Sequence, residues 1–245
     1  MSDIVTSYVD YPIGQGQVRA FLGMPTRTGP WPGVVVVHDI LGMASSVRAH
    51  ARRLARSGYI ALAPDLYSRG IPVWCVKATF DSLNRQGGRP FDYIDGARRW
   101  LAARNDCTGA IGVIGFCLGG GFALVAASSK YHFSASAVNY GDVPPNAATI
   151  LDGACPIVAS YGKRDPMPAN KQAAKRLRDT LASLRVEHDV QEYPYVGHSF
   201  MDDYGLLNRY GPISFVFRKI GLGYDRGASD SAWTRILTFF DQHLS

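Results

Sequence analysis

The sequence predicts an α/β fold with a mostly parallel central sheet and helices on both faces. Short, continuous apolar runs such as residues 34–37 are typical of strands that are buried on both faces. Segments with helical periodicity, such as residues 45–57, lie between these runs. Strands that alternate with helices imply parallel crossover units, which cover both faces of a sheet with helices. With 245 residues, 47% hydrophobic and 19% charged, the chain can bury a large core.

The chain opens with a predicted pair of strands, residues 8–11 and 17–22, because β-forming residues flank a glycine-containing turn there. In residues 45–57 apolar side chains recur at helical spacing, and Gly58 ends the helix. The same reasoning predicts further strands at 33–39, 59–63, 110–115, 134–140, 156–161 and 187–193, and helices at 93–104, 118–129, 169–184 and 229–244.

We expect one domain over residues 1–245, because neither an internal repeat nor a linker divides the chain. Two segments, 68–90 and 201–227, follow neither helix nor strand periodicity. Long irregular stretches in a compact domain are often lids or binding loops, so we expect that role for both segments.

Composition argues against several classes of function. The net charge is +6 and the sequence pI is about 9.2, but the basic residues are scattered along the chain. The densest group, Arg48, Arg52, Arg53 and Arg56, has the spacing of one helix flank and favours a solvated helix face. Since there is no longer basic stripe and no recognisable motif, we expect no nucleic-acid partner.

The chain shows no sign of export or membrane insertion. No apolar stretch reaches about 18 residues, and no apolar core precedes a cleavage site near the N-terminus, so we expect no membrane span and no signal peptide. The four cysteines, Cys75, Cys107, Cys117 and Cys155, include no C-x-x-C pair, which argues against a zinc or thioredoxin-like site. A cytoplasmic protein with free thiols is the simplest interpretation.

The strongest chemical signal is Gly115-Phe116-Cys117-Leu118-Gly119, which follows a predicted strand and opens a predicted helix. It matches the nucleophile elbow G-x-nucleophile-x-G, with cysteine in the usual serine position. Such a turn strains the nucleophile's backbone and leaves no room for side chains two residues to either side. A helix N-terminus favours the thiolate, and the Leu118 N–H would face a developing oxyanion. The alternative is a glycine-rich turn with an inert, buried cysteine.

Two further residues follow later predicted strands. Asp165 comes after strand 156–161, at the carboxyl end where open α/β sheets build their sites, although an aspartate before a proline is also a common turn former. His198 follows strand 187–193 in a glycine-containing loop, although a lone loop histidine is often only solvated. Nucleophile, acid and histidine in this chain order are typical of α/β-hydrolases, so the three residues together favour a Cys117–His198–Asp165 triad.

These motifs resemble the dienelactone hydrolase family. The resemblance runs from about Pro32 to the C-terminus and implies an α/β-hydrolase fold and a carboxylic ester hydrolase that acts on a small ester or lactone. The matching segments are His38-Asp39-Ile40-Leu41-Gly42, Ala63-Pro64-Asp65-Leu66-Tyr67, Gly115-Phe116-Cys117-Leu118-Gly119-Gly120, the Asp165 turn, Gly197-His198-Ser199-Phe200, and Ala232-Trp233-Thr234-Arg235 before Phe239-Phe240.

The resemblance also implies roles around the first of these motifs. The backbone N–H of Ile40 would be the second oxyanion donor. The family typically has glutamate just before this position, where it is thought to contact the resting cysteine and help generate the thiolate. This chain has Asp39, one methylene shorter. Asp39 is therefore either a modulator of Cys117 or only a residue that orders the loop.

Substrate contacts depart from the family pattern. Family members that act on dienelactone carry an arginine in the loop that begins with His-Ser-Phe, where it holds the substrate carboxylate. This chain has Met201, Asp202 and Asp203 there, and an acidic pair would repel a carboxylate. We therefore expect poor hydrolysis of dienelactone. Arg69 and Arg85, in segment 68–90, either supply a cationic contact to the substrate or are solvated.

The expected function is hydrolysis of a small ester or lactone through an acyl-enzyme on Cys117, with no metal and no cofactor. Two alternatives come from other classes: a catalytically weak ligand-binding member of the same fold, or a redox sensor that uses the Cys117 thiolate. The sequence predicts neither the natural substrate nor the oligomeric state.

Overall fold

A single twisted sheet of eight strands forms the centre of the computed structural model, which describes residues 3–68, 79, 81–203 and 223–245. Its strand order is β1-β2-β4-β3-β5-β6-β7-β8. The pairs β1–β2 and β2–β4 are antiparallel, and all the others are parallel. The strands are β1 (Ile4–Ile13), β2 (Gly16–Pro25), β3 (Trp31–Val37), β4 (Ile60–Pro64), β5 (Cys107–Phe116), β6 (Ala135–Asn139), β7 (Ile157–Gly162) and β8 (His188–Tyr193).

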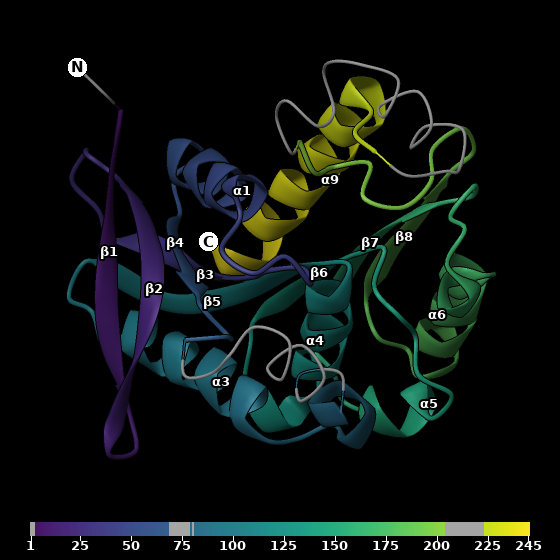
Figure 1. Ribbon diagram of the computed structural model, residues 1–245, viewed down its shortest axis with the longest axis horizontal. Helices are drawn as coiled ribbons and strands as arrows, with labels where there is room; N and C mark the ends of the chain where they lie inside the picture. Colours follow the sequence, from purple (N-terminus) through teal and green to yellow (C-terminus); the bar gives the residue numbers. More distant parts are fainter. Residues whose placement is uncertain (1–2, 69–78, 80, 204–222) are drawn as a thin grey trace.

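Helices cover both faces of the sheet, which confirms the predicted α/β class (Figure 1). One face carries α1 (Ser45–Arg56) and α9 (Arg226–Leu244). The other carries α3 (Arg89–Ala102), α4 (Leu118–Ala126), the short α5 (Ala147–Ile150) and α6 (Ala173–Ser183).

The buried strand β3 shows how the sequence builds these two layers. Successive side chains of a strand point to opposite faces. Val34 and Val36 accordingly pack in the layer under α1 and α9, whereas Val35 and Val37 pack in the layer under α3, α4 and α6. A continuous run of valines therefore serves two apolar cores at once, as parallel sheets require.

The element boundaries differ from the sequence-based prediction in several places. Strands β1 and β2 are longer than predicted, because they pair over ten residues each as one hairpin. Helix α3 begins at Arg89, with Pro90 in its first turn, where proline's missing N–H costs nothing. Helix α6 begins at Ala173, after a short 3₁₀ turn at Pro168–Asn170.

The two predicted lid segments are described only in part. Within segment 68–90, residues 79 and 81–85 are helical and α3 starts at Arg89, so the prediction of an irregular stretch is wrong there. Within segment 201–227, residues 201–203 are mostly buried and α9 starts at Arg226. Residues 69–78, 80 and 204–222 lie outside the described part of the chain.

The arginine group on α1 is not simply a solvated face. The guanidinium of Arg52 lies 5.0 Å from the centre of the Phe21 ring, and that of Arg53 lies 5.0 Å from the centre of the Trp233 ring. These two side chains therefore lie over aromatic rings of the core, while their charged ends stay partly exposed. No described helix combines the length and the apolar character that crossing a membrane would need.

Candidate active site

Cys117 lies at the junction of β5 and α4, with a backbone φ of 55°. A positive φ is strained for any residue other than glycine. Gly115 and Gly119 flank Cys117, and the structure leaves no room for a side chain at either position. A Cβ on Gly115 would lie 1.9 Å from the Gly119 carbonyl oxygen, and one on Gly119 would lie 2.3 Å from the Val37 carbonyl oxygen. Glycine at 115 lets the turn close, and glycine at 119 lets the start of α4 approach the end of β3.

Asp165 lies in the loop after β7, and its side chain is 2% exposed. Its Oδ1 accepts a hydrogen bond from the Met167 N–H at 2.9 Å, which is the turn-forming contact that an aspartate before a proline can make. Its Oδ2 accepts a 2.8 Å bond from Asn170 and a 2.7 Å bond from His198 Nδ1. The same carboxylate therefore orders its own loop and binds the histidine.

The loops that carry Asp165 and His198 are held against each other by their backbones. A Cβ on Gly162, the last residue of β7, would lie 2.4 Å from the Gly197 carbonyl oxygen. The Arg164 N–H donates to the Val196 carbonyl at 3.0 Å. Glycine at 162 thus allows a close approach that brings the acid and the imidazole to one place.

The hydrogen bonds assign the proton on His198. A carboxylate can only accept, so Nδ1 carries the proton that binds Asp165. Nε2 is buried and has no hydrogen-bond partner among the described residues. Burial disfavours the charged imidazolium, but the Asp165 carboxylate and the neighbouring Cys117 sulfur outweigh it and raise the pKa of His198 to about 10. A protonated imidazole beside a sulfur is the arrangement that stabilises a thiolate.

Two residues that sequence reasoning missed support this pair. Asn170 donates from Nδ2 to Asp165 and, at 3.0 Å, to the Tyr140 carbonyl. Tyr140 follows β6, and its ring packs edge-on to the His198 imidazole with centres 5.1 Å apart. The position of Tyr140 at the carboxyl end of a parallel strand was the available signal, because such ends share one edge of the sheet.

The loop after β3 lies against the first turn of α4. A Cβ on Gly119 would also lie 2.6 Å from the His38 carbonyl oxygen. Ile40 and Leu118, the two predicted oxyanion donors, each lie within two residues of this contact. Leu118 is the first residue of α4, where backbone N–H groups have no partner within the helix. Ile40 is 40% exposed and lies in the loop after β3.

Asp39 is buried, and its Oδ1 accepts a 2.7 Å hydrogen bond from the Leu41 N–H. Such a bond from an aspartate to the backbone two residues later is a common way to fix a tight turn. This contact supports the loop-ordering role of Asp39. A role as a modulator of Cys117 stays a prediction.

The expected acidic pair at the site is wrong for one of its two members. Asp202 is 1% exposed and points into the core, where Oδ1 lies 2.9 Å from His50 Nε2 and Oδ2 accepts a 2.5 Å bond from the Tyr140 hydroxyl. Met201 is buried as well. Asp202 therefore cannot repel a substrate carboxylate by direct contact, because a buried carboxylate must satisfy its hydrogen bonds inside the protein.

The two predicted arginine contacts are only partly located. Arg85 is exposed at the end of the helical stretch 81–85, and no contact of it with the candidate site is described. Arg69 lies outside the described residues. The described residues contain no group of three or more His, Cys, Asp or Glu side chains placed to hold a metal ion.

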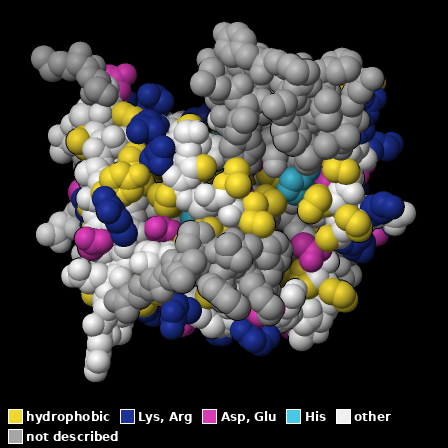
Figure 2. All heavy atoms as spheres, in the orientation of Figure 1, with side chains coloured by type: hydrophobic (Ala, Val, Ile, Leu, Met, Phe, Trp, Pro, Cys, Tyr) yellow, Lys and Arg dark blue, Asp and Glu magenta, His cyan; other side chains and the backbone are white. Residues whose placement is uncertain are grey.

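Apolar side chains border the candidate site. Four of the six large hydrophobic residues that are exposed in the described part of the chain lie in the loops after β3, β7 and β8; they are Ile40, Leu41, Met167 and Tyr195. Figure 2 shows hydrophobic side chains gathered near the centre of one face. Exposed apolar groups that cluster commonly mark a binding surface.

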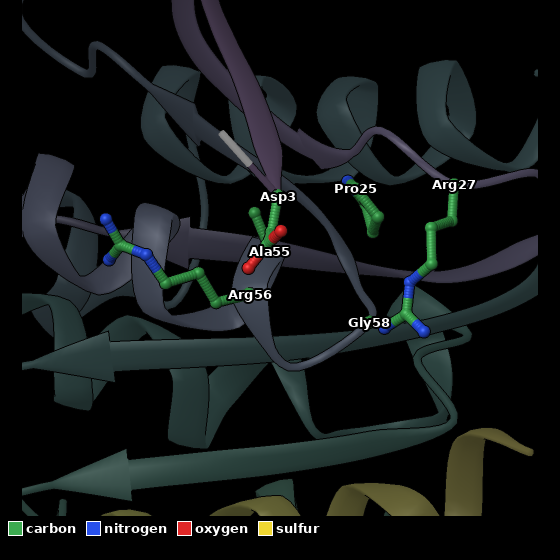
Figure 3. A pocket seen from close by; sticks show the side chains of 6 residues that line it. All are labelled: Asp3, Pro25, Arg27, Ala55, Arg56 and Gly58. Carbon is green, nitrogen blue, oxygen red and sulfur yellow. The ribbon is translucent and has the colours of Figure 1, made fainter. Parts of the chain in front are cut away.

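A polar surface pocket lies at the other end of the sheet (Figure 3). It is lined by Asp3, Pro25, Arg27, Ala55, Arg56 and Gly58. Gly58 comes shortly before β4 begins, so the pocket lies at the amino end of this parallel strand. Cys117, Asp165 and His198 all follow the carboxyl ends of their strands, and the pocket therefore takes no part in the candidate site.

Comparisons with known proteins agree with this arrangement. The model of the dienelactone hydrolase family matches residues 18–244. A Yersinia pestis protein, provisionally named carboxymethylenebutenolidase, is 26% identical over 243 residues, which cover 93% of this chain and 84% of that protein.

Solved structures show the same fold. A protein from Klebsiella pneumoniae, provisionally described as a dienelactone hydrolase, has a TM-score of 0.81 at 24% identity, over 98% of this chain and 100% of that one. The dienelactone hydrolase-like promiscuous phosphotriesterase P91 from metagenomic libraries has a TM-score of 0.79 at 23% identity over the whole of both chains. The chain belongs to the dienelactone hydrolase family and is a carboxylic ester hydrolase with the α/β-hydrolase fold.

Proposed function

We propose that the protein hydrolyses a small ester or lactone through Cys117 as nucleophile, His198 as proton carrier and Asp165 as the group that orients the imidazole. The observation that carries this proposal is the 2.7 Å bond between His198 Nδ1 and Asp165, on an imidazole whose pKa the Cys117 sulfur helps to raise. An imidazole held on one side by a carboxylate and facing a nucleophile on the other is the arrangement of acyl-transfer triads.

In the first half of the reaction, the Cys117 thiolate attacks the carbonyl carbon. The negative charge that moves to the carbonyl oxygen is stabilised by the N–H groups of Leu118 and Ile40. When the C–O bond breaks, the His198 imidazolium gives its Nε2 proton to the leaving alkoxide. From an ester, this step gives a free alcohol and an acyl group on Cys117. From a lactone, it gives a hydroxyacyl group on Cys117, because the new hydroxyl stays attached to the acyl chain.

In the second half, neutral His198 takes a proton from water, whose oxygen attacks the thioester carbonyl. The same two N–H groups hold the second oxyanion. The C–S bond then breaks, the carboxylic acid leaves, and the thiolate and the imidazolium are restored. Asp165 keeps Nδ1 protonated throughout, so that Nε2 is the nitrogen that exchanges the proton.

The substrate class follows from the border of the site. Ile40, Leu41, Met167 and Tyr195 offer exposed apolar surface. Each methylene of a substrate that they cover contributes about 0.8 kcal/mol to binding. We therefore expect uncharged small esters and lactones to be better substrates than carboxylated analogues of the same size. The relatives named carboxymethylenebutenolidase are named after a carboxylated butenolide. The butenolide ring supports a lactone as substrate, and the carboxyl group is where we expect this chain to differ.

The experiment is a stopped-flow burst of a chromogenic aryl ester, run with the native protein and with Cys117→Ala. The native protein should release about one equivalent of aryl alcohol in the burst, and Cys117→Ala should release none. Cys107→Ala is the matched control, because Cys107 is also a partly exposed free thiol. It should keep the full burst.

Other outcomes separate the alternatives. A native protein that binds the ester but gives neither a burst nor steady turnover is a ligand-binding member of the fold, and the proposal is then wrong. Reversible oxidation of Cys117 by peroxide without any ester burst would point to a redox sensor instead. A burst that survives in Cys117→Ala would assign the nucleophile to another residue.

A further inference from the structure

His38 lies next to the site but has no place in the mechanism above. It is 1% exposed, and both nitrogens of its ring are hydrogen-bonded. Nε2 lies 3.1 Å from the backbone nitrogen of Leu66, in the loop after β4. Nδ1 lies 2.6 Å from the carbonyl oxygen of Asp39, in its own loop after β3. The imidazole thus bridges two loops that are far apart in the sequence.

The partners fix the protonation state of this ring. A backbone N–H can only donate, so Nε2 must accept from Leu66 and carries no proton. A carbonyl oxygen can only accept, so Nδ1 carries the proton that binds Asp39. Burial, the largest influence, lowers the pKa of His38 and keeps the ring neutral, although the Asp39 carbonyl favours the charged form. Protonation of Nε2 would break the bond to Leu66.

The contact to Asp39 matters because of the peptide group that it holds. The Asp39 carbonyl and the Ile40 N–H belong to the same planar peptide unit, and in a trans peptide they point in opposite directions. Anchoring the carbonyl on the His38 ring therefore also sets the direction of the Ile40 N–H. The Gly42 N–H donates to the same carbonyl at 3.2 Å and adds a second anchor.

The other side of Ile40 is held as well. The Tyr67 hydroxyl donates to the Ile40 carbonyl at 3.2 Å. The Tyr67 ring packs edge-on to the His38 ring, with centres 4.8 Å apart. Both peptide groups that flank the Ile40 Cα are therefore bound by side chains of this one aromatic pair.

We propose that His38 and Tyr67 are positioning residues that hold the Ile40 N–H in the direction an oxyanion donor needs. This inference rests on the proposed function, since it assigns how one of the two oxyanion donors is oriented. It also gives a physical reason for two motifs of this chain, His38 to Gly42 and Ala63 to Tyr67: the second supplies the backbone donor and the hydroxyl that fix the first.

The direction of the donor is important because an oxyanion hole works by being organised before the reaction. Removal of one such donor lowers turnover by roughly 10²–10³-fold. A donor that is present but free to rotate loses part of that effect, so we expect an intermediate loss of about 10–100-fold when its anchor is removed.

The test compares two reactions of the same sulfur. Acylation by an aryl ester passes through an oxyanion, whereas alkylation by iodoacetamide does not. His38→Phe keeps a flat buried ring and removes both hydrogen bonds. It should slow acylation by about 10–100-fold and leave alkylation within about twofold of the native rate. Tyr67→Phe removes only the hydroxyl bond and should slow acylation by about 3–10-fold, with the KM of the ester nearly unchanged.

Tyr8→Phe on the exposed edge strand β1 is the matched control for loss of a tyrosine hydroxyl, and it should change neither rate. Native acylation in His38→Phe and Tyr67→Phe would overturn the inference. Equal losses of acylation and alkylation, with a lower melting temperature, would also overturn it, because His38 would then only support the fold.

Two further outcomes keep the test decisive. If His38→Phe does not fold, Tyr67→Phe carries the decision, because it removes a single oxygen from a partly exposed part of the loop. If the native protein gives neither a burst nor turnover of the ester, the proposed function has failed. A loss that is confined to the His38→Phe and Tyr67→Phe variants of an active native protein concerns the positioning role alone.

Discussion

The described residues contain two buried histidine–aspartate pairs, and one of the two has the layout of a catalytic pair. His198 binds Asp165 at 2.7 Å, and His50 binds Asp202 at 2.9 Å. All four side chains are at most 8% exposed. Distance and burial therefore do not distinguish the pairs.

The difference lies in what surrounds each imidazole. Asp165 holds His198 through Nδ1 and leaves Nε2 without a described partner, beside Cys117. Asp202 holds His50 through Nε2, and the His50 ring stacks on Phe116 with centres 3.9 Å apart. The second oxygen of Asp202 is taken by the Tyr140 hydroxyl. A buried carboxylate can thus either orient a base or link packed elements. The two cases differ in whether the free side of the imidazole faces a nucleophilic side chain.

The largest expected effect separates the two members of the proposed triad. We expect His198→Ala to lower kcat/KM for an aryl ester by about 10³-fold or more, because the proposed mechanism assigns every proton transfer to His198. Asp165→Asn should lower it less, since a thiolate is intrinsically nucleophilic and the asparagine still occupies the loop. Steady-state kinetics of both variants on one ester measures this order. A larger loss for Asp165→Asn would mean that the acid does more than orient.

The core pair should respond in stability rather than in catalysis. Asp202→Ala removes the buried carboxylate that binds His50 and the Tyr140 hydroxyl, so we expect the free energy of unfolding to fall by about 3 kcal/mol or more. The urea midpoint measures this loss. Asp179→Ala breaks the exposed ion pair with Lys175 and serves as control, with an expected change below about 1 kcal/mol.

The comparison of the two pairs would break if Asp202→Ala kept the native urea midpoint and lost activity as His198→Ala does. Asp202 would then belong to the reaction and not to the packing of β6, α1 and the loop after β8.

The pH profile of acylation tests the charge on His198. With an alkyl ester as substrate, the leaving alkoxide takes a proton from the imidazolium, so the acylation rate should fall as the pH rises through the pKa of His198, about 10. The Asp165 carboxylate helps to raise that pKa. In Asp165→Asn the group should therefore lose its proton at lower pH, and the alkaline limb should move down the pH scale. An alkaline limb at the same pH in both proteins would show that another group sets it.

The smallest effect is expected at Asp39. Asn at this position keeps an oxygen that can accept from the Leu41 N–H, but it removes the charge. If Asp39 only orders the loop, Asp39→Asn should leave the ester kinetics and the pH profile of Cys117 alkylation within about twofold. A clear shift in the alkylation profile would identify Asp39 as a modulator of the thiolate. Asp39→Ala, which also loses the turn, is the matched comparison.

Sequence patterns were most informative where the cause is local. The turn around Cys117 needs glycine at 115, because a Cβ there would lie 1.9 Å from the Gly119 carbonyl oxygen, so a local contact lets the sequence predict the elbow. The buried strands follow from continuous apolar runs, and β3 and β5 were found within a few residues of their observed ends. The hairpin of β1 and β2 was predicted too short, because its outer strand is mostly exposed and lacks an apolar run.

Patterns failed where two distant segments meet. Asp202 follows the His-Ser-Phe loop closely in the chain, and sequence position suggested a side chain in the site. Its actual partners are His50, 152 residues earlier, and Tyr140, 62 residues earlier. No local sequence pattern indicates that His50 on α1 lies close enough to bind the Asp202 carboxylate.

The sequence by itself determined the α/β class, the strand–turn–helix around Cys117 and the chain order of Cys117, Asp165 and His198. Each of these depends on interactions within a few residues or on the alternation of strands and helices. The tertiary structure decided which carboxylate meets which imidazole, and it placed His38 between the loops after β3 and β4. A hydrogen bond depends on direction and on distances of about 3 Å, and only the packed sheet brings such groups together.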